Sequence, residues 1–391
     1  MTEIILAIFF ITVLLLFLSS GVWVALSMIG VSAIAMELFT SRPVGDAMAT
    51  TIWGMSSSWT LTALPLFVWM GEILFRTKLS ENLFEGLSPW MQKLPGGLIH
   101  VNVVGCAIFA AISGSSAATV ATVGKMSIPE LRKRNYPEKI LLGSLAGSGT
   151  LGLLIPPSII LIIYGVTVQE SIAKLFIAGI FPGIMIAIIF MTYVVIWSLM
   201  NKNKMPVLTE EIPFIEKIKK SGKLIPVILL IVSVIGSIYS GVATATEAAS
   251  LGVVGALILS FFQKSLTTDS FKKSLLGATK TSCMIGFILA GSTFLSLAMG
   301  FTGLPRNLAI WIDTMQLSPY ILIIVLMIFY IILGMFLDGI SAVVLTMAII
   351  EPMIRQAGFD MIWFGIFLVV VVEMAQITPP VGFNLFVLQG M

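Results

Sequence analysis

Apolar residues fill long stretches of the chain, and short polar segments separate these stretches from one another. Many of them have 17 or more residues, and the segment 172–200 is one of the longest. A helix of about 17 to 25 apolar residues crosses the roughly 30 Å hydrocarbon core of a bilayer. The pattern therefore predicts an all-α polytopic membrane protein.

Several short motifs in the first half of the chain recur in the second half in the same order. The members of each pair are 220 to 225 residues apart, which is difficult to produce by chance. Such internal repeats are common in secondary transporters. The matched positions are Gly21 with Gly241, Pro95 with Pro319, Gly114 with Gly339, and the double-proline segments 155–165 with 378–390.

The repeat divides the chain into a first half, 1–200, a linker, 201–223, and a second half, 224–391. In the first half, the apolar segment 172–200 follows the double prolines, whereas the second half ends shortly after its own pair. By analogy between the halves, we expect a final helix of about 30 residues beyond Met391.

Charged residues are scarce and lie mostly between the apolar stretches. They make up 10% of the chain, and 58% of the residues are hydrophobic, whereas a soluble domain has about 25% charged residues. Lys and Arg gather in four segments that the positive-inside rule assigns to the cytoplasm, and the two outer segments hold one arginine each, Arg306 and Arg355. The cytoplasmic segments are 76–97, 125–139, 201–223 and 264–280, and the outer ones are 301–319 and 351–360. The two halves are thus predicted to have opposite orientations, as in an inverted-topology repeat.

Two segments begin and end on the same side of the membrane in this scheme. They are 98–124 and 320–350, and each has a glycine and polar side chains in its interior. A continuous span would change sides, so we expect two re-entrant hairpins whose tips are buried in protein or line a cavity. The part 320–336 is apolar enough to be a span by itself, which leaves the limits of the second hairpin open.

The hairpin tips carry the first candidate binding chemistry. The first tip, SGSSAAT at 113–119, has three serines, and the second, LDGIS at 337–341, has Asp338. A tip presents backbone carbonyls from one half-helix, which suit Na⁺, and N–H groups from the next, which suit a carboxylate. Close packing of small residues is the alternative for the first tip. For Asp338 the alternative to function is a structural ion pair, but no Lys or Arg lies near it in the sequence.

The double prolines Pro156–Pro157 and Pro379–Pro380 are expected to interrupt the helices 139–165 and 361–390. Proline removes an N–H donor and clashes with the preceding helical turn. Polar residues flank both pairs, which favours unwound stretches with exposed oxygens over simple kinks. Neutral oxygens with at most one carboxylate favour a monovalent ion over Ca²⁺.

Other features narrow the class of function. Glu247 either caps a helix or takes part in function, and the segment 79–94 has the spacing of an interfacial amphipathic arm helix. The sequence contains no P-loop, no Ser-His-Asp arrangement and no metal-ligand spacing of Cys and His. We therefore expect no enzymatic activity, no nucleic-acid partner, and transport that is driven by an ion gradient.

Five motifs in the same order resemble the large membrane subunit of tripartite ATP-independent periplasmic (TRAP) transporters. They are GSSAATVATVG, LAGSGTLGLLIPPSI, GVATATEAA, LDGISAVVLT and ITPPVGFNLFVLQGM, and the likeness spans essentially the whole chain. The resemblance implies a location in the bacterial inner membrane and an elevator mechanism, in which a transport domain slides against a scaffold, coupled to Na⁺. It also implies two partners, a small membrane subunit and a periplasmic substrate-binding protein. The substrate would be a small carboxylate, either sialic acid or a C4-dicarboxylate.

The resemblance also implies residues for two Na⁺ sites and for the substrate. One Na⁺ set is Ser113, Gly114, Ser115, Gly149 and Pro156, the other is Asp338, Gly339, Thr378 and Pro380, and the substrate candidates are Ser116, Ser158 and Asp338. A stand-alone carboxylate symporter is the nearest alternative function, and a channel or a non-transporting scaffold is a more distant one. Coupling to protons instead of Na⁺ also stays open, because Asp338, Glu247 and Glu373 could titrate.

Overall fold

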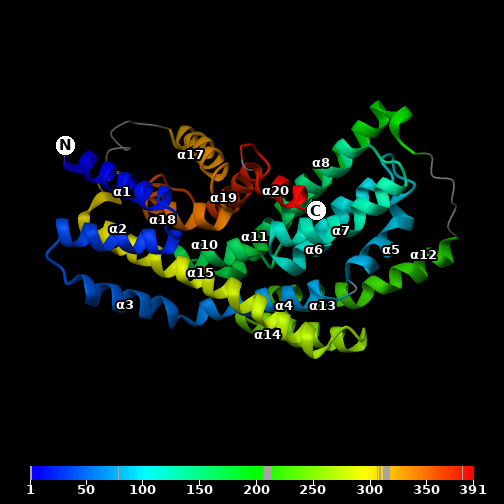
Figure 1. Ribbon diagram of the computed structural model, residues 1–391, viewed down its shortest axis with the longest axis horizontal. Helices are drawn as coiled ribbons and strands as arrows, with labels where there is room; N and C mark the ends of the chain where they lie inside the picture. Colours follow the sequence, from blue (N-terminus) through cyan, green and yellow to red (C-terminus); the bar gives the residue numbers. More distant parts are fainter. Residues whose placement is uncertain are drawn as a thin grey trace.

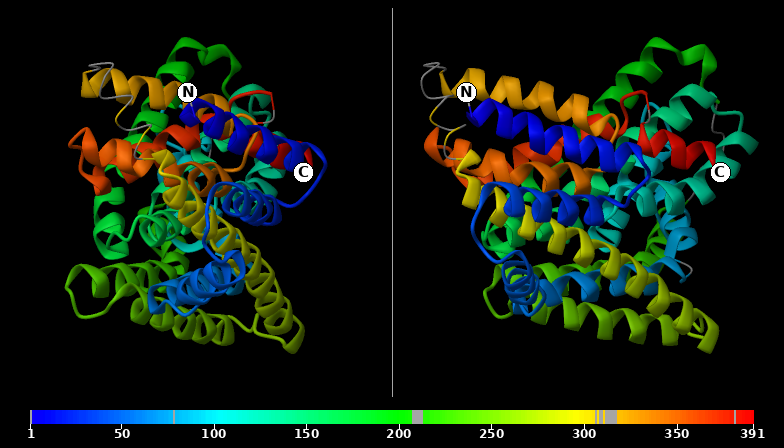
Figure 2. Two further views of the ribbon diagram at one scale, coloured as in Figure 1. Left: turned by 90° about the vertical axis from the view of Figure 1, so that its left-hand side faces the viewer. Right: turned by 60° about the vertical axis from the view of Figure 1, so that its left-hand side comes forward.

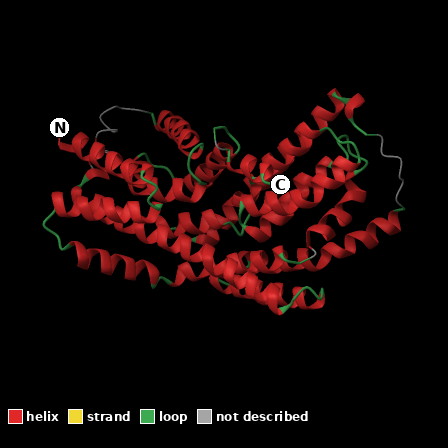
Figure 3. Ribbon diagram, in the orientation of Figure 1, coloured by secondary structure: helices red, strands yellow, loops and turns green. Residues whose placement is uncertain are grey.

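Helices make up all the regular structure in the part of the chain that the computed structural model describes, which is residues 2–77, 79–206, 213–305, 307, 310, 318–380 and 382–391 (Figure 3). Among these described residues, five helices are long and apolar enough to cross a membrane, and the number rises to seven if each of two bent helix pairs is one span. Shorter apolar helices lie among them. The predicted all-α, multi-pass fold is confirmed.

Six helices form a layer that we call the scaffold layer, along the lower part of Figure 1. At its centre, α15 packs against α2, α3 and α4, while α14 packs against α4 and α13. α1 (Thr2–Ser19) lies against α2. The layer consists of α2 (Val24–Phe39), α3 (Val44–Ser56), α4 (Ala63–Phe75), α13 (Ile225–Tyr239), α14 (Ala245–Phe262) and α15 (Thr268–Thr302).

Corresponding turns begin the second helix of each half. Gly21, before α2, and Gly241, before α14, have φ angles of 77° and 70°, which only glycine adopts at little cost. Thr244 and Glu247 then form a capping box at the start of α14, in which a Glu247 carboxylate oxygen accepts the Thr244 N–H at 2.8 Å. Of the two roles expected for Glu247, the structure shows the cap.

Ten further helices form what we call the hairpin bundle (Figure 2). It contacts the scaffold layer through α4, which packs against α6 and α10, and through α15, which packs against α18. Its first part is α6 (Ile99–Ser113), α7 (Ser116–Lys133), α8 (Glu138–Gly149), α9 (Leu151–Leu154), α10 (Ile159–Thr167) and α11 (Ile172–Met200). Its second part is α17 (Pro319–Gly334), α18 (Gly339–Gln356), α19 (Met361–Gln376) and α20 (Phe383–Gln389).

The first hairpin, α6 and α7, is longer than the sequence suggests. Its two helices pack against each other, and α7 continues to Lys133, well past the expected limit at residue 124. The basic segment 125–139 therefore begins as a helix rather than as a loop. Its helical part has a buried face, because Ser127, Ile128 and Leu131 are buried at helical spacing.

The second hairpin, α17 and α18, has a different packing. α17 packs mainly against α19 and has little contact with α18. The sequence left the limits of this hairpin open. In the structure it extends from residue 319 to residue 356, with a non-helical turn at 335–338. About half of the predicted outer segment 301–319 falls outside the described residues, and Arg306 is among those not described.

Both predicted helix interruptions are present. The segment Glu138–Leu154 and α10 meet at an angle of 40° around the first break, 155–158. α19 and α20 are separated by the second break, 377–382, of which residue 381 is not described. The Pro156–Pro157 and Pro379–Pro380 peptide bonds are both cis.

The predicted arm helix is α5 (Leu79–Met91), and a short helix, α12 (Phe214–Ser221), lies against it. Trp90 joins the two, because its indole N–H donates to Ser221 Oγ at 2.7 Å and the Lys217 ammonium lies 5.8 Å from the Trp90 ring centroid.

Candidate functional site

The first hairpin tip is a compact turn of mostly buried oxygens. α6 ends at Ser113, Gly114 has a left-handed conformation with φ of 59°, and Ser115 caps α7. Ser113 Oγ lies 2.8 Å from Thr119 Oγ1, and these hydroxyls are 3.2 and 2.8 Å from the Ser115 carbonyl oxygen. Three oxygens therefore share only two hydroxyl protons. An oxygen cluster without net charge suits a hard monovalent cation such as Na⁺.

The first break lies directly against this tip. The Gly114 carbonyl accepts the Ile159 N–H at 3.3 Å, and a Cβ on Gly114 would lie 2.7 Å from the Pro157 carbonyl oxygen. On α9, a Cβ on Gly152 would lie 2.5 Å from the Ser115 carbonyl oxygen. Only glycine at these two positions allows the backbones to approach so closely.

The other predicted residues of the first half lie around this contact. A Cβ on Gly149 would be 2.0 Å from Val120 Cγ2, so α8 lies close to α7. Pro156 is buried, and α11 covers it at Gly179. Ser158 is fully buried, caps α10, and donates its hydroxyl proton to the Leu153 carbonyl.

The second tip begins with an exposed acid. Asp338 caps α18, where one carboxylate oxygen accepts the N–H groups of Ile340 and Ser341, both at 3.1 Å. Thr378, in the second break, donates its hydroxyl proton to the Met374 carbonyl at 2.7 Å, and Pro380 is exposed. The Asp338 carboxylate is thus held by its own helix start and is open to solvent on its other side.

Gln376, at the end of α19, touches both tips. Its side-chain oxygen accepts the Ser116 hydroxyl proton at 2.8 Å, across 260 residues of sequence. A Cβ on Gly339 would lie 2.8 Å from Gln376 Nε2 and 3.3 Å from Ile160 Cδ1 of α10. The structure therefore brings Ser116 and Gly339 together, one from each half, around Gln376, one of the polar residues that flank the second double proline, which the sequence does not assign to a binding site. The signal was available, since Gln376 is polar and follows a strongly apolar run.

One further acid lies near this point. Glu373, one turn before Gln376, is only 3% exposed, and its Oε1 makes no hydrogen bond to any described residue. Within the described residues, no group of three or more His, Cys, Asp or Glu side chains could hold a metal ion. The oxygens available at the two tips are therefore hydroxyls, carbonyls and the single carboxylate of Asp338.

The family described as "Tripartite ATP-independent periplasmic transporter, DctM component" matches residues 11–391. The C4-dicarboxylate TRAP transporter large permease protein DctM of Pseudomonas aeruginosa is 34% identical over 357 residues, which are 91% of this chain and 82% of that protein. The 2,3-diketo-L-gulonate TRAP transporter large permease protein YiaN of Escherichia coli is 32% identical, over 88% of this chain and 80% of its own length. The isethionate TRAP transporter permease protein DctMQ of Oleidesulfovibrio alaskensis is 31% identical, over 96% of this chain and 59% of its own length.

A solved structure has a similar fold. The YdaH transporter of Alcanivorax borkumensis, described as having an unusual topology, superposes with a TM-score of 0.63 over 96% of this chain and 90% of that one. The sequence identity is 11%, so the likeness concerns the fold alone.

Proposed function

The chain belongs to the TRAP transporter family as its DctM component, the large membrane subunit, and from this premise we propose that it imports a small organic acid, coupled to Na⁺. Three relatives are named for C4-dicarboxylates, 2,3-diketo-L-gulonate and isethionate, which are all small organic anions. Of the two substrate types expected from the sequence, the C4-dicarboxylate is the one that a relative's name supports. We propose a small carboxylate of this kind.

One observation carries the proposal, namely the contact of both hairpin tips with Gln376. Ser116 donates to Gln376 from the first tip, and Gly339 packs against the same side chain from the second. The oxygen cluster at Ser113, Ser115 and Thr119 is part of the first tip. A cation held there would place positive charge near the start of α7, whose free N–H groups suit a carboxylate. The two ligands would then favour each other's binding.

We propose that the hairpin bundle moves against the scaffold layer during transport. The two groups meet mainly where α4 packs against α6 and α10 and where α15 packs against α18. One of these contacts is at Gly71 of α4, where a Cβ would lie 3.2 Å from the Ile112 carbonyl oxygen next to the first tip. At another position, Ser292 of α15 donates its hydroxyl proton to the Val344 carbonyl of α18 at 2.7 Å. Small residues at such contacts allow close approach without interlocking side chains.

The proposed transporter works with a small membrane subunit and a periplasmic substrate-binding protein in the bacterial inner membrane. The test is uptake of a radiolabelled C4-dicarboxylate by proteoliposomes that contain both membrane subunits, with the binding protein added outside. We expect accumulation with an inward Na⁺ gradient and none when K⁺ replaces Na⁺. Equal accumulation in both salts would contradict Na⁺ coupling, and uptake that does not need the binding protein would indicate a stand-alone symporter.

Proton coupling is the second candidate, and Glu373 is the observation that favours it. A carboxyl group that is buried without a hydrogen bond to Oε1 is a natural proton carrier in a membrane. The same proteoliposomes distinguish the two ions, because a protonophore would abolish proton-coupled uptake in K⁺ medium and leave Na⁺-driven uptake in place.

A further inference from the structure

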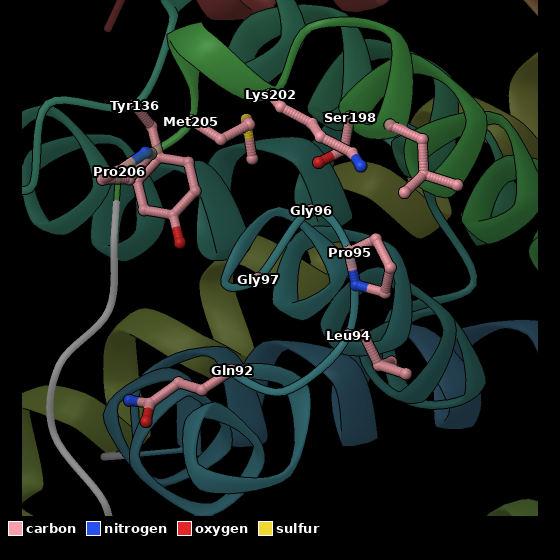
Figure 4. A pocket seen from close by; sticks show the side chains of 11 residues that line it. Gln92, Leu94, Pro95, Gly96, Gly97, Tyr136, Ser198, Lys202, Met205 and Pro206 are labelled. Atoms are coloured by element: carbon pink, nitrogen blue, oxygen red, sulfur yellow. The ribbon is translucent and has the colours of Figure 1, made fainter.

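A pocket of about 330 Å³ lies away from the hairpin tips, where α11 ends (Figure 4). Three segments line it, namely the segment between α5 and α6, the loop after α7, and the end of α11 with the residues that follow it. Apart from Ser198 and Leu199 of α11, the lining residues belong to 76–97, 125–139 and 201–223, three of the segments that the charge pattern predicts on the cytoplasmic side. The pocket therefore lies at the predicted boundary between the cytoplasm and the inner leaflet.

Four polar side chains line this pocket, the Gln92 amide, which can donate and accept, the hydroxyls of Tyr136 and Ser198, and the Lys202 ammonium. Tyr136 and Ser198 are 5% and 6% exposed, and the Lys202 side chain is exposed. The Tyr136 oxygen accepts the Leu98 N–H at 3.1 Å, which leaves its O–H proton for another acceptor. Burial raises the pKa of Tyr136, against smaller lowering effects of the Leu98 hydrogen bond and the Arg134 charge, so the hydroxyl keeps its proton. None of the lining residues is an acid.

The fold holds the floor of the pocket in a fixed shape. Gly96 and Gly97 have φ angles of 106° and 52°, and a Cβ on Gly96 would lie 2.6 Å from Val194 Cγ1 of α11. The ring nitrogen Nε2 of His100 lies 2.8 Å from the Pro95 carbonyl oxygen and ties the turn to α6. Figure 4 shows the side chains of Tyr136, Ser198 and Lys202 arranged around this glycine turn.

The chemistry of the lining selects an anion with several acceptor oxygens. Two buried hydroxyl donors and an ammonium group complement a phosphate, and the absence of acids among the lining residues removes the main repulsion. Leu199 and Met205 add apolar surface beside the polar groups. Basic pockets at the cytoplasmic ends of membrane helices suit the headgroups of anionic phospholipids.

We propose that this pocket binds the phosphate of an anionic phospholipid of the inner leaflet, between the base of the first hairpin and the end of α11. The lipid would bridge the turn 94–97 and the segment 198–206. Free inorganic phosphate carries the same chemistry, so the experiment includes it as a separate ligand.

The test is lipid titration of the purified, delipidated full-length chain, followed by native mass spectrometry. The ligands are dioleoylphosphatidylglycerol, dioleoylglycerol, which has the same acyl chains without phosphate, and inorganic phosphate as a competitor. The variants are Lys202→Gln and Ser198→Leu, which fills the pocket. Lys204→Gln is the matched control, since Lys204 is an exposed lysine two residues away that does not line the pocket.

We expect saturable binding of phosphatidylglycerol, weakened about tenfold by Lys202→Gln, as for the loss of one charge-assisted hydrogen bond. Ser198→Leu should abolish the same binding event, and Lys204→Gln should leave it unchanged. Competition by inorganic phosphate at millimolar concentration would identify the phosphate group alone as the ligand, and no competition would identify the lipid. Equal binding of dioleoylglycerol, or equal effects of Lys202→Gln and Lys204→Gln, would overturn the proposal.

Discussion

Each half of the chain contributes one hairpin tip and one helix break, which we call a pair. The two pairs have related sequences but different surroundings. In the first pair, Pro156, Pro157 and Ser158 are buried, and α11 covers the break at Gly179 and Gly183. In the second pair, Pro379, Pro380 and Asp338 are exposed. The first tip is held by backbone contacts across the break, whereas the second tip approaches α19 through side chains. The first pair is thus fixed by close backbone contacts, whereas the second tip rests on side-chain contacts.

The largest expected effect comes from a substitution that disrupts the close backbone contact of the first pair. Gly152→Ala places a Cβ within 2.5 Å of the Ser115 carbonyl oxygen, and a backbone atom cannot move aside as a side chain can. We expect uptake to be lost and the free energy of unfolding to fall by roughly 1–3 kcal/mol. Uptake and thermal unfolding in detergent measure the two effects.

Gly143→Ala is the matched control for this prediction, because Gly143 is a helical glycine of α8 with open space where the Cβ would lie. It should be neutral or slightly stabilising, since alanine favours helix. Gly339→Ala sharpens the comparison, because its Cβ would meet only ends of side chains, Gln376 Nε2 and Val372 Cγ1. A loss of stability at Gly339 equal to that at Gly152 would contradict the difference between the pairs.

The second prediction concerns the Asp338 carboxylate at the second tip. Asp338→Asn keeps a good cap for α18, so stability should hardly change. It removes the one carboxylate at the tips, so we expect uptake to fall by about tenfold or more. Asp360→Asn is the control, because Asp360 caps α19 in the same way and accepts the Trp363 N–H at 2.9 Å. If both variants lost uptake equally, the role of Asp338 would be that of a cap.

A third prediction tests the link between the two pairs. Ser116→Ala removes the hydrogen bond to Gln376, and we expect a loss of about 1 kcal/mol in stability and a partial loss of uptake. A double-mutant cycle with Gln376→Met should give a coupling energy of the same size. Ser127→Ala is the control on the same helix, since the buried Ser127 hydroxyl makes no hydrogen bond to the described residues. A coupling energy of zero would mean that the halves are not linked through Gln376.

The smallest expected effect is at Glu247. This acid is an exposed helix cap of the scaffold layer, so Glu247→Gln should slightly lower the melting temperature and leave uptake unchanged. The uptake of Glu247→Gln is the reference for the loss of a capping carboxylate that lies away from the tips. A strong loss of uptake would show that capping acids outside the tips also take part in transport.

The sequence predicts the local features of this fold well, because proline, glycine and capping residues act over one or two helical turns. The double prolines predict both breaks, and the glycine at 114 predicts the first tip. Long-range contacts are different. The hydrogen bond between Ser116 and Gln376 depends on how two halves pack, which no local pattern encodes. The packing of α17 against α19 rather than α18 has the same origin, since an apolar helix fits either neighbour.

The most direct test of the account is equilibrium binding of ²²Na⁺ to the purified membrane complex. If the tips hold Na⁺, binding is saturable, is not displaced by K⁺, and reaches one more ion per chain in the natural protein than in Ser113→Ala, which lacks a hydroxyl of the oxygen cluster. The Ser127→Ala protein should bind as many ions as the natural one. Binding that does not saturate, or the same number of ions in Ser113→Ala as in the natural protein, would contradict a Na⁺ site at the first tip.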